Sequence, residues 1–274
     1  MAVSCPPLTS FDDDIALTEE DGAFHGSVAE GWDTPRGPLG GYVMALVLNG
    51  MILATGDDAR QPRSLTVHFL RPPHAGPVTV RPTVERAGRR LSTVTARLEQ
   101  DGKVIALALG AFSAPWPSPH VDDAPAPDVE PPDESRPPVP DLREGRPRPS
   151  FARRLTMQRR FGDPPFSRAE HATVGGWLAL TERRPIDALT VVVLADAWFP
   201  APWPRLSDLA PAPTVDLTVH FHAPLPLPDG LLLGRFTNSV VRDGFFDEDG
   251  RLWAQDGTLV AQSRQLGLLI DPQL

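Results

Sequence analysis

The sequence repeats itself, and this repeat constrains the fold more than any other feature. The segment SLTVHF at 64–69 recurs as DLTVHF at 216–221, and EQDGKVIALALGAF at 99–112 is matched by AQDGTLVAQSRQLG at 254–267. The first pair is offset by 152 positions and the second by 155, so one three-residue insertion relates them. Five identical residues and a shared QDG turn favour a duplicated unit over chance similarity between two β-rich halves.

Each half reads in the same order, as an apolar helix followed by strands. Helices are expected at 40–54 and at about 187–198, where the sequence is apolar on all sides. Alternating apolar residues and Asp-Gly turns predict antiparallel strands at 64–70, 78–85, 91–100 and 103–112, and at 216–222, 231–241, 250–254 and 258–269. A sheet that covers such a helix must curl round it. The predicted fold class is α+β, with two tandem units of an antiparallel sheet wrapped around a long helix.

A proline-rich segment separates the halves. Twelve prolines fall between Pro115 and Pro149, mixed with acidic residues and arginine. Proline blocks helix and central strand, and so polar a segment cannot bury enough apolar area to order itself. We expect an extended or partly disordered linker. The predicted domains are 1–115 and 151–274, joined by a linker at 116–150.

Charge and cysteine content exclude several classes of protein. The net charge of −9 argues against a nucleic-acid binder held by phosphate contacts. The single cysteine, Cys5, excludes internal disulfides and suits a reducing cytoplasm, which is the expected location. The N-terminus lacks the basic start and apolar stretch of a signal peptide. The most apolar run, at 39–54, is too short to span a bilayer, so no membrane span is expected.

Four segments resemble the acyl-CoA thioesterase II family. GPLGGYVMALVLNGM at 37–51 is similar to the glycine-start helix of these enzymes, and SLTVHFLRPP at 64–73 to the strand that follows it. DLTVHFHAPL at 216–225 and QDGTLVAQSRQLG at 255–267 resemble strands of the family's second domain. The resemblance implies a double hot-dog fold, hydrolysis of acyl-CoA in lipid metabolism, and a homo-oligomer.

The resemblance also implies three catalytic residues. Asp216, in VDLTVHFH, matches an aspartate that opens a strand of the second domain. Ser239, in FTNSVV, takes the place of a threonine, and Thr237 is a competing match. Gln265, in QLG, matches the glutamine of a QEG motif, from which Leu266 departs.

Strand alternation bears on the position of Asp216. This residue lies opposite the apolar face of Leu217, Val219 and Phe221, so we expect it to point toward the seam between the two sheets. Ser64 takes the equivalent place in the first half, so the carboxylate is present in one half only. The alternative is an ordinary solvated aspartate at the start of a strand.

These residue types suit hydrolysis without a covalent nucleophile. Asp216 would activate a water molecule, which the hydroxyl of Ser239 and the carboxamide of Gln265 would hold. Gly40 and Gly41 open the first helix, where backbone N–H groups could stabilise the oxyanion; alternatively, they only permit tight helix–strand packing. The side chains of Asp216, Ser239 and Gln265 should therefore converge within water-bridging reach.

Other site classes lack their motifs. The sequence has no GxSxG elbow, no HExxH, no GxGxxG and no cluster of cysteine and histidine. We therefore expect neither a metal nor another cofactor, and acyl-CoA is the expected substrate. The alternative is a non-catalytic acyl-CoA- or lipid-binding protein that keeps the pocket, and the departures at Ser239 and Leu266 leave it open.

Overall fold

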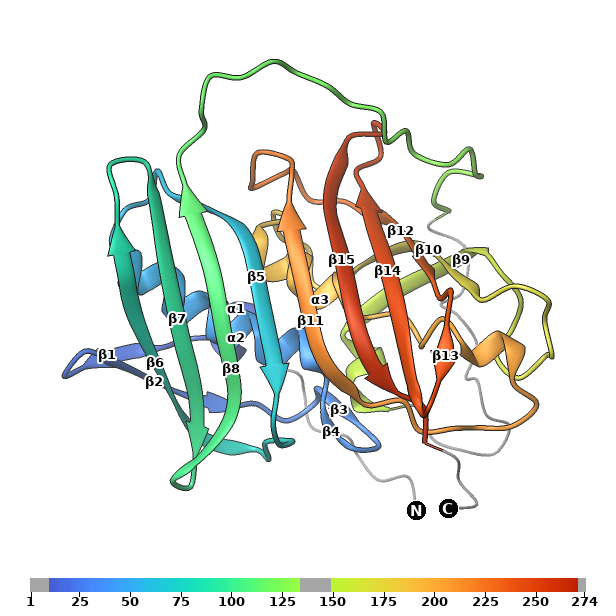
Figure 1. Cartoon of the computed structure of the whole chain (residues 1–274), viewed down its shortest axis with the longest axis horizontal. Helices are drawn as coiled ribbons and strands as arrows, with labels where there is room; N and C mark the ends of the chain where they lie inside the picture. The colour runs from blue at the N-terminus through green and yellow to red at the C-terminus, as the bar shows by residue number, and fades with distance from the viewer. Residues whose placement is uncertain (1–9, 134–148, 271–274) are drawn as a thin grey trace.

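The chain folds into one large antiparallel sheet that curves around two helices (Figure 1). The computed structural model describes residues 10–133 and 149–270. Over these residues the sheet has 13 strands in the order β1-β2-β6-β7-β8-β5-β11-β15-β14-β12-β10-β9, with β13 paired to β14. The helices α2 (Gly40–Thr55) and α3 (Ala188–Ala195) pack against each other on one face of this sheet.

The remaining elements follow the order of the repeat. In the first half they are α1 (Phe11–Asp14), β1 (Thr18–Glu20), β2 (Ala23–Val28), β3 (Asp33–Thr34), β4 (Gly37–Pro38), β5 (Gln61–Phe69), β6 (Gly76–Ala87), β7 (Leu91–Gln100) and β8 (Lys103–Ser113). In the second half they are β9 (Leu155–Phe161), β10 (Thr173–Leu180), β11 (Thr214–Phe221), β12 (Leu232–Thr237), β13 (Val241–Arg242), β14 (Phe245–Trp253) and β15 (Leu259–Leu268). Short 3₁₀ turns occupy Ser150–Arg153 and Trp203–Arg205.

The two repeated strands meet at the centre of the sheet. β5 and β11 pair antiparallel with Thr66 opposite Thr218, and the two hydroxyls are hydrogen-bonded at 2.9 Å. These threonines are equivalent positions of the repeat, so a pseudo-twofold axis passes through their pair. The prediction of two tandem sheet-and-helix units is therefore confirmed.

The helix α2 is buried on almost all sides, as its uniformly apolar sequence predicts. It contacts β5, β6, β7 and β8 of its own half and α3 of the other. Gly41 permits the contact with α3, because a Cβ atom there would lie 2.7 Å from the carbonyl oxygen of Val192. The Asp187 carboxylate caps α3 by accepting the backbone N–H of Thr190 at 2.8 Å. This helix ends at Ala195, three residues earlier than expected.

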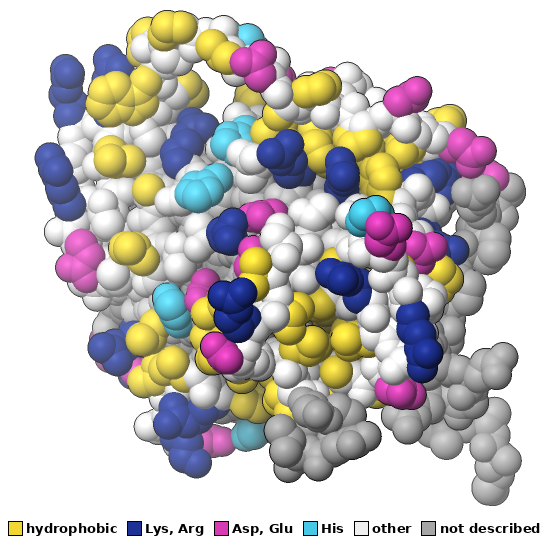
Figure 2. Space-filling model, turned by 45° about the vertical axis from the view of Figure 1, so that its right-hand side comes forward, with side chains coloured by type: hydrophobic (Ala, Val, Ile, Leu, Met, Phe, Trp, Pro, Cys, Tyr) yellow, Lys and Arg dark blue, Asp and Glu magenta, His cyan; other side chains and the backbone are white. Residues whose placement is uncertain are grey.

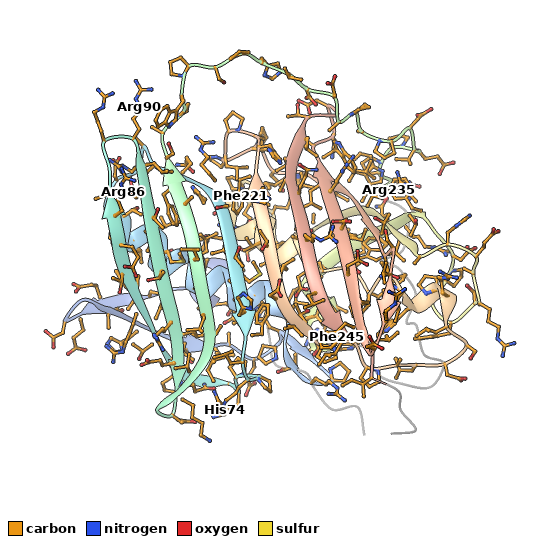
Figure 3. The ribbon with its side chains drawn as sticks, viewed as in Figure 1. His74, Arg86, Arg90, Phe221, Arg235 and Phe245 are labelled. Atoms are coloured by element: carbon orange, nitrogen blue, oxygen red, sulfur yellow. The ribbon has the colours of Figure 1, made fainter. Side chains whose placement is uncertain are left out.

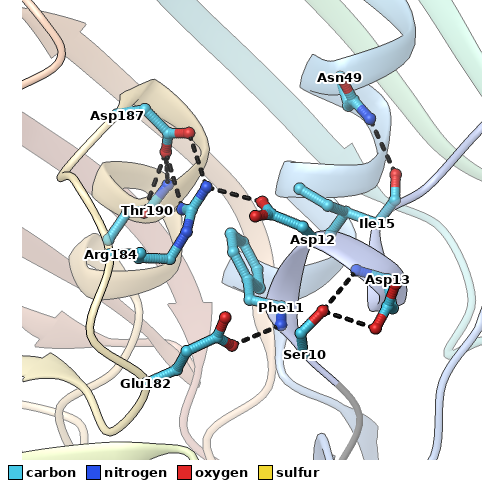
Figure 4. A network of polar contacts seen from close by, with 10 residues as sticks. All are labelled: Ser10, Phe11, Asp12, Asp13, Ile15, Asn49, Glu182, Arg184, Asp187 and Thr190. Carbon is cyan, nitrogen blue, oxygen red and sulfur yellow. Dashed lines mark hydrogen bonds and ion pairs between the residues drawn. The ribbon is translucent and has the colours of Figure 1, made fainter.

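The N-terminal segment is bound to the second half of the chain by hydrogen bonds and ion pairs (Figure 4). The backbone N–H of Phe11 donates to the Glu182 carboxylate at 2.7 Å. The Arg184 guanidinium lies over the Phe11 ring and bridges the carboxylates of Asp12, at 2.8 Å, and Asp187, at 3.0 Å. Residues more than 170 positions apart are thereby held together by charge and by ring contact.

A buried ion pair also joins the N-terminal segment to the second half of the chain. The Arg154 guanidinium of the second half donates to the Asp14 carboxylate of the first at 2.8 Å, and both side chains are almost inaccessible. The Trp32 indole donates to the same carboxylate at 2.9 Å, and the guanidinium lies 4.9 Å from the centre of the Trp32 ring. A guanidinium and an indole N–H thus compensate the cost of burying this carboxylate.

The first part of the linker is anchored to the sheet. It leaves β8 beside the β6–β7 hairpin, where the Arg90 guanidinium lies 4.9 Å from the centre of the Trp116 ring (Figure 3). It then crosses to the second half, where the indoles of Trp253 and Trp177 each donate to a linker carbonyl oxygen at 2.8 Å. The described part, 114–133, is extended and contains neither helix nor strand, and 134–148 lie outside the described residues.

The surface carries mixed charge. Basic and acidic side chains are interspersed over the face drawn in Figure 2. Within 10–133 and 149–270, no helix is long and apolar enough to cross a membrane.

We expect Arg154→Met to destabilise the protein strongly. The variant leaves the Asp14 carboxylate buried without its guanidinium, and breaking a buried pair in this way typically costs about 3–5 kcal/mol. The free energy of unfolding in urea measures the loss. Arg81→Met is the matched control, because the Arg81–Glu99 pair lies on the surface, where such pairs contribute about 0–1 kcal/mol. Equal losses in the two variants would contradict a structural role for the buried pair.

Candidate active site

A cavity of about 1050 Å³ lies where the two halves meet. Its wall comes from the start of α2, the loop after α3, the strands β11, β14 and β15, and the segment at 149–157. Most of the wall is apolar and includes Val43, Phe69, Leu155, Met157, Trp198 and Phe199. A large apolar cavity with few polar groups is the usual form of a small-molecule site.

Asp196 brings a carboxylate into this cavity. It directly follows α3, and its Oδ2 accepts the backbone N–H of Gly41 at 2.7 Å, at the N-terminus of α2. No side chain of the first half caps this helix, so a carboxylate from the second half does. Gly40 allows the approach, because a Cβ atom there would lie 2.9 Å from Oδ2. Burial raises the pKa of Asp196 to about 7, although hydrogen bonds from Gly41 and Gly40 lower it.

Thr214 and Gln265 form a second polar group in the wall. The Gln265 carboxamide donates to the Thr214 hydroxyl at 2.7 Å, and the Gln265 side chain is only 7 % exposed. An irregularity in β11 between Thr214 and Asp216 shifts the register, so that Thr214 pairs with Gly267. Gly267 and Gln265 lie on the same face of β15, and the bulge thereby turns Thr214 inward beside Gln265.

Glu248 is a further carboxyl in the wall. It pairs directly with Gln265 across β14 and β15, and its Oε2 accepts the backbone N–H of Ala201 at 2.6 Å. Burial raises its pKa to about 8, the Ala201 hydrogen bond lowers it, and the charges of Asp196, Asp247 and Asp249 raise it.

The cavity therefore holds the groups that water-mediated hydrolysis requires. A carboxyl with a pKa near 7 can accept a proton from water at neutral pH. A hydroxyl and a carboxamide can orient that water and polarise a carbonyl group. The described part of the chain has no cluster of three or more potential metal ligands.

The expected convergence of Asp216, Ser239 and Gln265 is wrong. In the ladder Asp216 pairs with Leu266, while Gln265 pairs with Leu217, so the Asp216 and Gln265 side chains leave opposite faces of the sheet. Asp216 shares the outer face with His68 and the 36 % exposed Leu266. The alternation of apolar and polar residues correctly placed the Asp216 side chain away from the core. That face of the sheet is the outer surface of the molecule and not a seam between two sheets.

Of the other expected site residues, Ser239 lies away from the cavity and three line it or approach it. Ser239 is exposed in the turn between β12 and β13, and its N–H donates to Asp247 at 3.3 Å. Gln265 and Gly40 line the cavity. Gly40 and Gly41 do open α2, but both N–H groups serve the Asp196 carboxylate.

Sequence reasoning missed Asp196, Thr214 and Glu248. One signal for Asp196 was present, a lone carboxylate in the apolar run VVVLADAWF, where a buried charge needs a reason. Thr214 had no such signal, because the bulge that turns it inward cannot be read from alternation. Glu248 stands between two other acidic residues, a pattern that is typical of a solvated strand end.

Several solved structures share this architecture over their whole length. A conserved protein of unknown function with a hot dog fold from Alicyclobacillus acidocaldarius is 29 % identical, with a TM-score of 0.85 over 97 % of this chain and 100 % of that one. A putative thioesterase II from Thermobifida fusca YX is 26 % identical, with a TM-score of 0.77 over 94 % and 98 %. The tesB protein of Mycobacterium avium subs paratuberculosis, at 20 % identity and a TM-score of 0.76 over 95 % and 98 %, supports the fold alone. The tandem hot-dog fold is thus confirmed.

Family models match the two halves separately and in order. The model of the acyl-CoA thioesterase N-terminal domain matches residues 28–113, and the model of the C-terminal domain matches residues 123–269. No curated protein matches the chain. Because the C-terminal model alone covers more than half of the sequence, the chain belongs to the acyl-CoA thioesterase family and is a thioester hydrolase.

Proposed function

We propose that the protein hydrolyses acyl-CoA thioesters to a free acid and CoA by means of a water molecule that Asp196 activates. The observation that carries this proposal is the position of the Asp196 carboxylate, held at the N-terminus of α2 in the wall of a large apolar cavity. Asp196 takes the role that the sequence suggested for Asp216. Thr214 takes the role that the sequence suggested for Ser239, and Gln265 keeps its role.

These three residues suffice for the proton transfers and bond changes of the hydrolysis. Asp196 accepts a proton as the water oxygen bonds to the thioester carbon, and the Thr214 hydroxyl holds that water. One N–H of the Gln265 carboxamide is bonded to Thr214, and the other polarises the carbonyl oxygen. Collapse of the tetrahedral intermediate breaks the carbon–sulfur bond, and CoA leaves as the thiolate. The proton held by Asp196 then passes to the products.

The mouth of the cavity suits the CoA part of the substrate. Arg36 and Arg71 belong to the cavity lining and are exposed. Guanidinium groups bind phosphate in a bidentate manner, so they would hold the CoA phosphates outside the apolar interior. The acyl chain would then enter the cavity between α2 and β15.

Two further expectations belong to this proposal. A single cysteine suits a reducing cytoplasm. Exposed apolar side chains on the outer face of the first half, such as Leu91 and Leu109, suit a homo-oligomer. Light scattering would measure the oligomer.

We expect Asp196→Asn to lower kcat on acyl-CoA by about 10²–10⁴-fold, because the amide cannot accept the proton. The amide oxygen can still accept the Gly41 N–H, so the fold should persist. Release of free thiol from saturated acyl-CoAs of several lengths measures the effect. Asp216→Asn is the matched control and should stay within about twofold of the wild type, because that carboxylate lies on the outer face. Loss in the control with survival of Asp196→Asn would refute the assignment. Tight binding of intact thioester without thiol release would favour a binding protein.

We expect kcat/KM to rise with pH up to about pH 7 and to level off above it. The base must be deprotonated, and burial raises the pKa of Asp196 to about 7, so each pH unit below that value should cost about tenfold. A pH profile between 5 and 9 on one acyl-CoA measures this dependence. The Asp216→Asn variant should show the same profile. Activity that is already level at pH 5 would mean that the base is a carboxyl with an ordinary pKa.

A further inference from the structure

Glu248 is a cavity-lining carboxyl that the proposed mechanism does not use. Its side chain is 8 % exposed, and its Oε2 accepts the Ala201 N–H at 2.6 Å. Across residues 10–133 and 149–270 its side chain makes this one hydrogen bond, through Oε2, and no ion pair. One oxygen of this nearly buried carboxyl group, Oε1, is therefore available to form a hydrogen bond with a ligand in the cavity.

The first half of the chain shows that the fold does not need this carboxyl. The repeat makes Gly110 the counterpart of Gln265, and the paired strands agree: Gly110 pairs with Val94, as Gln265 pairs with Glu248. Val94 is completely buried. An apolar side chain thus serves the same position in one half, while the other half keeps a carboxyl that is costly to bury without a cation.

Glu248 presents a donor to the cavity at neutral pH. The charges that raise its pKa are those of Asp196 in the cavity wall and of Asp247 and Asp249 on its own strand, and Arg264 pairs with the last two. Burial raises its pKa to about 8, so the protonated form predominates at neutral pH. With one oxygen accepting from Ala201, the hydroxyl is the group left for a ligand.

The donor lies near the point where the thioester would react. Glu248 and Gln265 are direct cross-strand neighbours on the inner face, where Cβ atoms are about 5 Å apart. A saturated acyl chain passing this wall would leave the hydroxyl unpaired. An oxygen on the first carbons of the chain would accept its hydrogen bond, and a site with such an unpaired group discriminates against the ligand that lacks the partner.

We propose that Glu248 is a specificity-determining residue that selects acyl-CoA thioesters with a carbonyl or hydroxyl oxygen on the first few carbons of the acyl chain over the saturated chain of equal length. The proposal rests on the function proposed above and narrows its substrate class.

The test compares kcat/KM for 3-oxoacyl-, 3-hydroxyacyl- and saturated acyl-CoA of one chain length. The wild type should prefer at least one oxygenated substrate by about tenfold or more, and which one it prefers identifies the accepting group. Glu248→Val copies Val94 and should bring the ratio to within about threefold of one. Glu248→Gln should keep the preference, because its carboxamide can accept from Ala201 and donate to the substrate. A ratio measured on one preparation is insensitive to the folded fraction.

The matched control is Arg251→Gln. It removes a charge from the same strand three positions further along, on the exposed outer face, and should leave the ratio unchanged. Equal kcat/KM values for all three substrates in the wild type, or a ratio that Glu248→Val does not alter, would overturn the proposal while the hydrolase remains. If no thioester is hydrolysed, the proposed function fails, and calorimetric binding of the same substrates to the wild type and to Glu248→Val decides the selectivity: equal affinities overturn it.

Discussion

A carboxylate of the second half caps the helix of the first, and both the fold and the site depend on this contact. The N-terminus of α2 has unsatisfied N–H groups and no side-chain cap of its own. Asp196 reaches it only because Gly40 and Gly41 carry no Cβ atom. The same contact joins the two helices and orients the carboxylate in the cavity. Separation of the halves would therefore expose the helix end and dismantle the site together.

Enclosure by the curved sheet gives this carboxylate its chemical character. A carboxyl in water would be ionised far below neutral pH and would be a weak base. The helix end favours the charged form, yet the apolar surroundings outweigh it and raise the pKa of Asp196 to about 7. Apolar side chains of the cavity wall, such as Phe69 and Trp198, are part of the surroundings that produce this shift.

The sequence predicts the architecture well and the site incompletely. The repeat, the apolar helix from Gly40 and the two glycines at its start could be read directly, because each depends on local pattern. Gln265 could be placed by resemblance. Asp196 could not be predicted, because its position depends on the N-terminus of α2, which is 155 residues away in the chain. Thr214 escaped because a single bulge reverses its face, and Asp216 misled because alternation gives a side and not what lies on that side.

The pseudo-twofold axis through Thr66 and Thr218 has an evolutionary consequence. In a dimer of identical subunits, every residue that improves one site appears in the other as well, whether it is useful there or not. The covalent duplication removes that obligation. Here the counterpart of Gln265 is Gly110, whose missing side chain leaves room for Met51, so this position serves packing in the first half and lines the cavity in the second. At each pair of equivalent positions, one copy is free to vary for packing while the other varies for chemistry.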